Sequence, residues 1–175
     1  MSDKALYSST NTEVIPAGAA DGLLKRTAAN NGWEFKTAAQ LGASPTLLQT
    51  TFVEQATDTS TTSVSFVDLL TQAITIQAGS ILLITVTASM SNTSANQNMD
   101  IQITIDGVAA RGAGTRVATS NVPQGFSIVY RKTGLAVGAH TIKVQWRTPS
   151  GGTMRVRPAT TLNEHCSMLI QEVTV

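Results

Sequence analysis

Apolar and polar residues alternate along most of the chain after residue 45. The clearest run is residues 140–147, where every second side chain is apolar: Ile142, Val144 and Trp146. Because successive side chains of a strand point to opposite faces, strict alternation predicts a β-strand that is buried on one face. Turn residues border this run at 134–139 and 149–152, and alternation resumes at 153–157. These segments predict an antiparallel hairpin.

The same pattern predicts strands at residues 47–54, 64–70, 73–77, 82–90, 99–105, 108–120, 126–130 and 166–175, and polar loops at 58–63, 91–98 and 157–164. Asp106-Gly107 is a strong hairpin signal, because a type I′ turn needs positive φ at both central residues. Gly112 and Gly114 interrupt the next strand and indicate a bulge or a close approach. With no helical period after residue 45, the sequence predicts an all-β fold, an antiparallel β-sandwich or jelly roll.

Residues 1–45 have a different character from the predicted head domain at 46–175. Their apolar residues come in short clusters between Gly, Pro and Asn, with neither a helical nor a strand period. Such a segment buries too little surface to fold alone, so we expect an extended arm that another protein holds in place. The expected anchors are the apolar residues of these clusters: Val14, Ile15, Leu23, Leu24, Trp33 and Phe35. The alternative is that the arm folds back on its own domain.

The last predicted strand, 166–175, is apolar on both faces. Met168 and Ile170 alternate with a second apolar set, which comprises Leu169, Val173 and Val175. A strand that is covered on both faces has either a central place in the fold or a place in a subunit interface. We therefore expect the second set to line a contact between subunits.

Composition narrows the function classes. Charged residues make up 13% of the chain, against roughly 25% in typical domains, and the net charge of +1 gives no electrostatic case for nucleic-acid binding. The single cysteine, Cys166, excludes an intrachain disulfide and a cysteine-based zinc site. The start of the chain lacks the apolar core of a signal peptide, and the most apolar run, 81–88, is far shorter than the roughly 20 residues of a membrane span. We expect synthesis in a cytoplasm and no membrane partner.

Few residues suggest chemistry. His165 and Cys166 are a possible nucleophilic pair, but neighbours on a strand point to opposite faces, which favours Cys166 as a small buried apolar residue. His140 has no second metal ligand nearby in the sequence, and no carboxylates are paired at a suggestive spacing. Trp146 could stack on a sugar, but its alternation places it in the core. The prediction is therefore no enzyme, no metal and no cofactor.

Several segments resemble the jelly-roll tip domains of bacteriophage and prophage fibre and decoration proteins: Asp106-Gly-Val108, residues 138–147, the Gly-Gly-Thr turn at 151–153, residues 156–160 and residues 169–173. In the arm, residues 20–27 and the Gly-Trp-Glu-Phe segment at 32–35 resemble fibre amino-termini that join a virion anchor to a distal head. The resemblance implies a homotrimer of jelly rolls of the complement and tumour-necrosis-factor type. It supplies no active site to carry over.

The leading prediction is a structural virion protein, a capsid decoration (cement) protein or short head fibre. It would be assembled in the host cytoplasm, would trimerise through its head and would attach through its arm to the major capsid protein or another virion protein. The absence of a long shaft or a coiled-coil repeat favours this over a full tail fibre. The alternative is a receptor-binding knob of a fibre that binds host surface glycan. A fibre-borne glycan hydrolase or lyase is weakest, because no convergent carboxylates are visible.

Overall fold

The computed structural model describes residues 45–156 and 165–174 in full, and the backbone of four strands before them. These four strands form two antiparallel hairpins: β1 (Lys4–Tyr7) with β2 (Thr12–Ile15), and β3 (Gly22–Arg26) with β4 (Trp33–Thr37). The hydrophobic pattern did not predict them. By internal contacts the chain divides into two units, Met1–Ser44 and Pro45–Val175.

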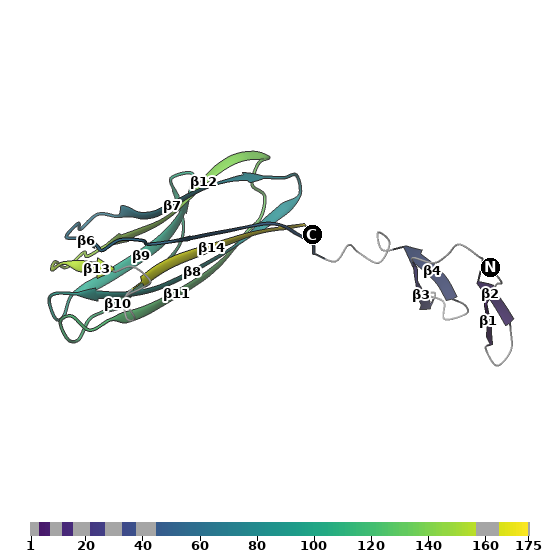
Figure 1. Cartoon of the computed structure of the whole chain (residues 1–175), viewed down its shortest axis with the longest axis horizontal. Helices are drawn as coiled ribbons and strands as arrows, with labels where there is room; N and C mark the ends of the chain where they lie inside the picture. Colours follow the sequence, from purple (N-terminus) through teal and green to yellow (C-terminus); the bar gives the residue numbers. More distant parts are fainter. Residues whose placement is uncertain are drawn as a thin grey trace. The chain divides into compact units, whose positions relative to one another are not determined.

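The second unit consists of two antiparallel sheets, whose strands Figure 1 labels. The first sheet has the order β5-β14-β8-β13-β6, with β11 paired to the other side of β8; the second has the order β10-β9-β12-β7. The strands of the first sheet are β5 (Leu47–Glu54), β6 (Thr59–Thr61), β8 (Ser80–Asn92), β11 (Gln124–Lys132), β13 (Met154–Val156) and β14 (His165–Thr174). Those of the second are β7 (Val67–Ile76), β9 (Asn98–Ile105), β10 (Val108–Arg116) and β12 (Gly138–Arg147).

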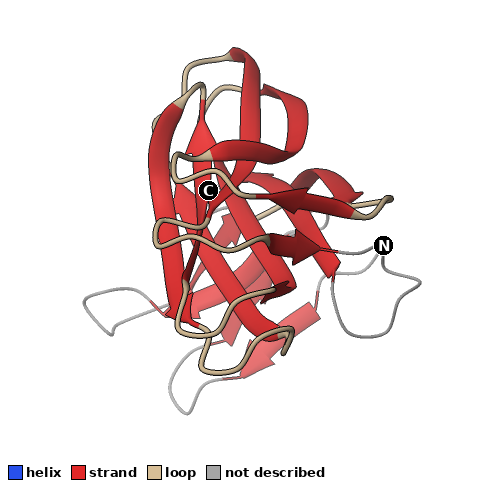
Figure 2. Cartoon of the chain, turned by 90° about the vertical axis from the view of Figure 1, so that its left-hand side faces the viewer, coloured by secondary structure: helices blue, strands red, loops and turns tan. Residues whose placement is uncertain are grey.

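Every described element is a strand or a loop, which confirms the predicted all-β sandwich (Figure 2). A helix with the length and apolarity needed to cross a bilayer does not occur in the described part of the chain. The core lies between the two sheets and is built from the alternating positions of the long strands. Its fully buried large side chains include Leu82, Ile84, Met90, Ile101, Ile103, Ile142, Trp146, Met168 and Ile170. Trp146 is 1% exposed, so it is a core residue and not a sugar platform.

Three boundaries and one strand pairing differ from the sequence prediction. Residues 140–147 and 153–157 do not form the predicted hairpin, because β12 pairs with β7 and β9 of the second sheet, whereas β13 pairs with β6 and β8 of the first. The segments 64–70 and 73–77 are not two strands, because β7 runs unbroken from Val67 to Ile76. The polar segment 58–63 contains a short strand, β6, whose hydroxyl side chains gave no alternation to detect. The strand predicted at 108–120 ends at Arg116. The predicted loop at 157–164 lies outside the described residues.

The β9–β10 turn forms as predicted: Asp106 and Gly107 have φ of 51° and 80°, the two positive values that a type I′ turn needs. The bulge of β10 falls at Ala110, before the two glycines, since the register shifts between Ala109 and Arg111. The prediction of a close approach applies to Gly114, where a Cβ atom would lie 2.6 Å from Oδ1 of Asp100. Gly114 therefore makes room for a carboxylate on the neighbouring strand.

Candidate interaction surface

The two sheets of the sandwich expose outer faces of different chemistry. On the second sheet the outward side chains form a hydrogen-bonded polar ladder. Gln102 Nε2 donates to Gln145 Oε1 at 2.8 Å, and Gln145 Nε2 donates to Asp68 Oδ1 at 2.7 Å. Lys143 Nζ lies 2.5 Å from Asp68 Oδ2, and its hydrogen bond, followed by that of Gln145, holds the pKa of Asp68 below its usual value. These four side chains satisfy one another, as suits a face that stays in water. Next to them, Thr104 of β9 is buried and its hydroxyl has no partner among the described residues.

The outer face of the first sheet carries a row of mostly apolar side chains. The register places Phe52 of β5, Leu169 of β14, Thr85 of β8 and Val129 of β11 side by side across four adjacent strands. Phe52 is 59% exposed and Val129 is 69% exposed, while Leu169 and Thr85 between them are half-buried. The row thus exposes one large apolar side chain at each end, with Leu169 and Thr85 between them. Exposed apolar surface on one sheet face is typical of a surface that another protein covers.

The rows on either side extend this surface with hydroxyl and apolar groups. One row is Glu54, Ser167, Thr87 and Ser127, and the other is Thr50, Gln171, Leu83 and Arg131. We call this surface, which comprises these three rows and Val173, the β14 face. Its only charges are Glu54 on the β5 side and Arg131 on the β11 side, so its middle carries no charge.

Two of the three predicted interface residues lie on this face. Leu169 and Val173 point outward and are half-buried, whereas Met168 and Ile170 lie in the core, so β14 is apolar on both faces as its sequence indicates. Val175 lies outside the described residues. Sequence reasoning missed Phe52 and Val129, because only the strand register brings them into one row with Leu169. The side chains of the expected arm anchors Val14 and Ile15 in β2, Leu23 and Leu24 in β3, and Trp33 and Phe35 in β4 lie outside the described part, and their anchoring role stays a prediction.

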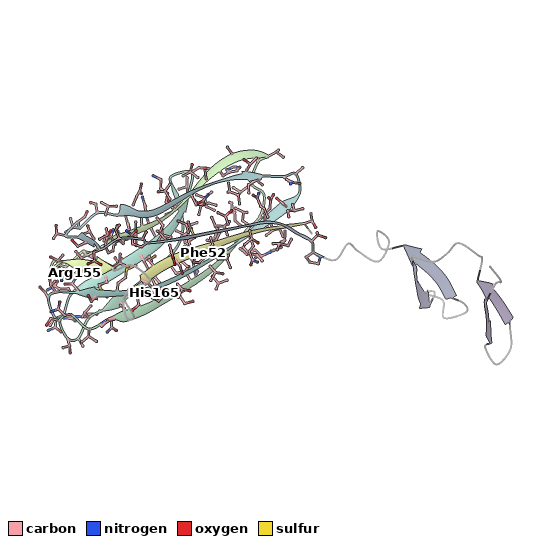
Figure 3. All side chains as sticks on the ribbon, viewed as in Figure 1. Phe52, Arg155 and His165 are labelled. Carbon is pink, nitrogen blue, oxygen red and sulfur yellow. The ribbon has the colours of Figure 1, made fainter. Side chains whose placement is uncertain are left out.

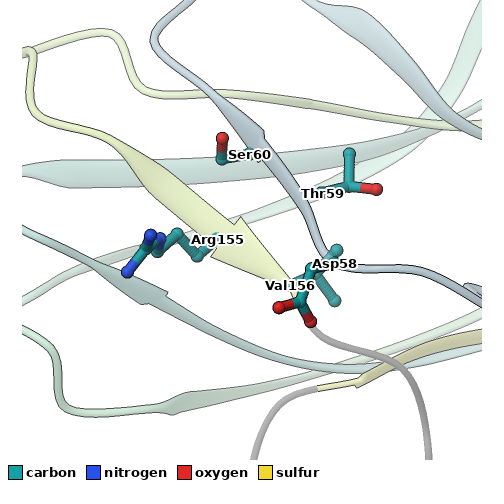
Figure 4. A pocket seen from close by; sticks show the side chains of 5 residues that line it. All are labelled: Asp58, Thr59, Ser60, Arg155 and Val156. Atoms are coloured by element: carbon teal, nitrogen blue, oxygen red, sulfur yellow. The ribbon is translucent and has the colours of Figure 1, made fainter.

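Beyond the β14 face, the same outer side of the sheet carries two basic residues (Figure 3). His165 pairs with Ser89 of β8, and Arg155 pairs with Ser91 two residues further along. Arg155 also borders a small cavity of about 120 Å³, lined with Asp58, Thr59, Ser60 and Val156 (Figure 4). This cavity offers hydroxyls and both signs of charge, which suits a small polar group.

Cys166 and His165 do not form a nucleophilic pair. Cys166 is fully buried, and burial raises the pKa of its thiol to about 12. His165 alternates to the other face of β14. The thiolate is the reactive form of cysteine, so Cys166 is unreactive at neutral pH. Among residues 45–156 and 165–174, no three side chains of His, Cys, Asp and Glu gather closely enough to hold a metal ion.

His140 has a structural partner that the sequence did not reveal. Its Nδ1 lies 2.6 Å from Oδ2 of Asp106, and its Nε2 lies 2.9 Å from the carbonyl oxygen of Ala136. Both partners are acceptors, so the doubly protonated ring satisfies both. The hydrogen bond to Asp106, then that to Ala136, raises the pKa of His140 above 6.5. His140 thus joins the loop before β12 to the β9–β10 turn.

Glu172 is a buried charged group whose partners sequence reasoning missed. It is fully buried on the core side of β14, where Ser80 Oγ donates at 2.5 Å, the Gln77 backbone N–H at 2.6 Å, and Gln49 Nε2 donates as well. Burial alone would raise the pKa of Glu172, but these hydrogen bonds outweigh it and the pKa lies below its ordinary value. Glu172 therefore ties β5, the β7–β8 turn and β14 together as an anion.

The sequence matches no protein-family model, and no curated protein matches it. Among solved structures, the insecticidal delta-endotoxin Cry8Ea1 of Bacillus thuringiensis aligns with 12% identity over 63% of this chain and a TM-score of 0.41. Latent PorU from Porphyromonas gingivalis aligns with 11% identity over 74% of this chain and a TM-score of 0.44. The VP2 subviral particle of infectious bursal disease virus aligns with 10% identity over 95% of this chain and a TM-score of 0.38.

The chain spans only part of each of these proteins: 19% of Cry8Ea1, 14% of PorU and 47% of VP2. Every one of these TM-scores is below 0.5, so no statement about this chain's activity or partners follows from them.

Proposed function

We propose that this chain is a structural virion protein, such as a capsid decoration protein or short head fibre. In this proposal the head, residues 46–175, assembles with copies of itself through the β14 face, and the arm, residues 1–45, attaches it to a capsid protein or another virion protein. The observation that carries the proposal is the contrast between the two outer sheet faces. One carries a ladder of hydrogen-bonded polar side chains, whereas the other exposes Phe52 and Val129 and has a middle free of charge.

The charges at the rim of the β14 face support a second copy as its occupant. Glu54 lies on the β5 side and Arg131 on the β11 side, and neither has an ion pair among the described residues. A neighbouring copy whose β5 edge lies over the β11 edge of the first brings these opposite charges together. Complementary rim charges of this kind fix the orientation of an interface more than they add to its affinity.

A homotrimer would also explain how a short arm can attach the protein firmly. Joining three heads makes the second and third arm contacts intramolecular, so each acts at a high effective concentration. Weak contacts per arm then add up to stable attachment. In this proposal the protein is not an enzyme; the burial of Cys166 and the structural engagement of His140 support that part of it.

The arm part of the proposal is tested by comparing the full chain with a chain that lacks residues 1–45, each added to capsids purified without it. We expect the full chain to bind in many copies per shell and the truncated chain to lose binding while keeping its oligomeric mass. Capsid binding that survives truncation would refute attachment through the arm. A handful of copies per particle would place the protein on the tail instead.

The second candidate function is a knob that binds host surface glycan. The cavity of Asp58, Thr59, Ser60 and Arg155 favours it, because hydroxyls and a guanidinium bind the hydroxyl and carboxylate groups of acidic sugars. A glycan array with the native chain and with Arg155→Ala tests it. Binding of acidic glycans that the substitution abolishes would support the knob, and an array without hits would eliminate it.

A further inference from the structure

A cavity of about 270 Å³ lies between the β9–β10 hairpin, the end of β11 and the loop that follows it. Most of its lining is apolar, and its polar side chains are those of Asp106, Tyr130 and Lys132. The apolar lining consists of Ile105, Val108, Ala109, Ala110 and Leu135. This volume lies just under the roughly 300–1,000 Å³ of drug-sized ligand sites. The cavity therefore fits a small molecule, and it is unrelated to the β14 face.

The strand register aims these side chains into the cavity. Tyr130 and Lys132 pair with Ile84 and Leu82 of β8, which are both buried core residues, so they point to the inner side of their sheet. From the other sheet, Val108 pairs with Ile105. The bulge of β10 places Ala110, a small residue, against the cavity. Bulges of this kind commonly lie beside binding sites, where they redirect a strand edge.

A set of hydrogen bonds among His140, Asp106, Thr141 and Ala136, which we call the His140 clasp, holds one wall of the cavity in place. Asp106 accepts hydrogen bonds from His140 Nδ1 at 2.6 Å and from the Thr141 N–H at 2.9 Å, and His140 Nε2 reaches the carbonyl of Ala136 at 2.9 Å. The loop that carries Leu135 is thereby fixed against the β9–β10 turn. A wall that is already in place costs less ordering entropy when a ligand binds.

Of the polar groups of the cavity, only the donors lack a partner among the described residues. Both carboxylate oxygens of Asp106 are engaged in the clasp. The Lys132 ammonium has no ion pair, and neither it nor the Tyr130 hydroxyl has a hydrogen bond to any described residue. The cavity thus presents an unpaired cation and a hydroxyl donor at the end of an apolar pocket. We propose that it binds a small organic carboxylate with a short apolar tail, the carboxylate on Lys132 and Tyr130 and the tail against Val108, Ala110 and Leu135.

The test uses the full chain, labelled with ¹⁵N, and two probes of equal chain length, hexanoate and 1-hexanol. We expect hexanoate to shift the amide resonances of Ala109, Ala110 and Leu135, and 1-hexanol to bind roughly tenfold more weakly or worse, because it lacks the charge that pairs with lysine. Lys132→Met should remove that preference and leave 1-hexanol binding unchanged. Arg131→Met is the matched control: it removes the same charge from the adjacent residue on the opposite face and should leave hexanoate binding as it is.

Amide shifts that map elsewhere, or no hexanoate binding by the native chain, would overturn the proposal. So would hexanoate binding that is equal in the native chain and in Lys132→Met, because Lys132 would then be only a hydrated surface cation. The measurement on the native chain does not depend on any variant folding. The proposal also stands or falls independently of self-association, since the β14 face contributes no residue to the cavity.

Discussion

Glu172 gives the sharpest test of how the head is held together. Glu172→Gln keeps the shape of the side chain but removes its charge and turns one acceptor oxygen into an NH₂ group that faces a donor. Of its donors, the Gln77 N–H belongs to the backbone and cannot turn away, whereas Ser80 and Gln49 can do so only in part. Hydrogen bonds to charged groups are roughly twice as strong as neutral ones, and one unmatched buried donor costs about 1–3 kcal/mol.

These terms predict that Glu172→Gln lowers the free energy of unfolding by about 3 kcal/mol at pH 7, which corresponds to a fall in Tm of roughly 6–12 °C for a chain of this size. Urea unfolding followed by tryptophan fluorescence measures the change. Asp58→Asn is the control, because it makes the same carboxylate-to-amide change at an exposed position. The control should stay within about 0.5 kcal/mol of the native chain.

The pH dependence of the free energy of unfolding provides a second test of the role of Glu172. The folded-state pKa of Glu172 lies below its ordinary value of 4.5, so its contribution is complete above that value and is lost as the pH falls through the folded pKa. The difference between the native chain and Glu172→Gln should therefore be constant from pH 7 to about 5 and shrink in acid. A difference of less than about 0.5 kcal/mol at pH 7, or one that grows in acid, would refute this role of the Glu172 anion.

Three further predictions concern the surface, the clasp and the thiol. Phe52→Ser should weaken self-association roughly 100-fold in sedimentation equilibrium. Covering the exposed 59% of a side chain of about 200 Å², at ~25 cal/mol per Å², contributes about 3 kcal/mol. The control Val137→Ser, at an exposed loop position outside the β14 face, should leave self-association unchanged. Because the pKa of His140 is raised in the folded chain, protonated His140 stabilises the fold below pH 6.5, and this contribution is lost as the pH rises through the folded pKa. His140→Gln should therefore flatten the fall in the free energy of unfolding, measured in urea, between pH 6 and 9. An unchanged slope would contradict the proposed role of the His140–Asp106 contact. Cys166 should resist iodoacetamide in the native chain and react in denaturant, and rapid native labelling would show that the thiol is accessible.

Much of the fold could be predicted because a buried sheet imposes a period of two on its sequence. The alternation at 140–147 fixed β12, and Asp106-Gly107 fixed the turn before β10. The prediction failed where the period carries no hydrophobic signal. β6 has the sequence Thr-Ser-Thr, and the polar residues Thr71 and Gln72 made the single strand β7 look like two.

The candidate surface could be predicted only in part, because it depends on register. Leu169 and Val173 stood out, since they make one strand apolar on both faces. Phe52 and Val129 did not, because they are far apart in the sequence and share a row only through the register of β14 and β8, which lie between them. The same reason hid the His140–Asp106 contact, which joins residues 34 positions apart, and the donors to Glu172. Long-range pairing of polar groups leaves no local pattern.

The mass of the full chain in solution tests the central claim most directly, because the proposed head works only by joining copies of itself through the β14 face. Sedimentation equilibrium at micromolar concentrations should give about 55 kDa, three times the chain mass of 18.4 kDa. A mass of 18.4 kDa that does not change with concentration would contradict the account.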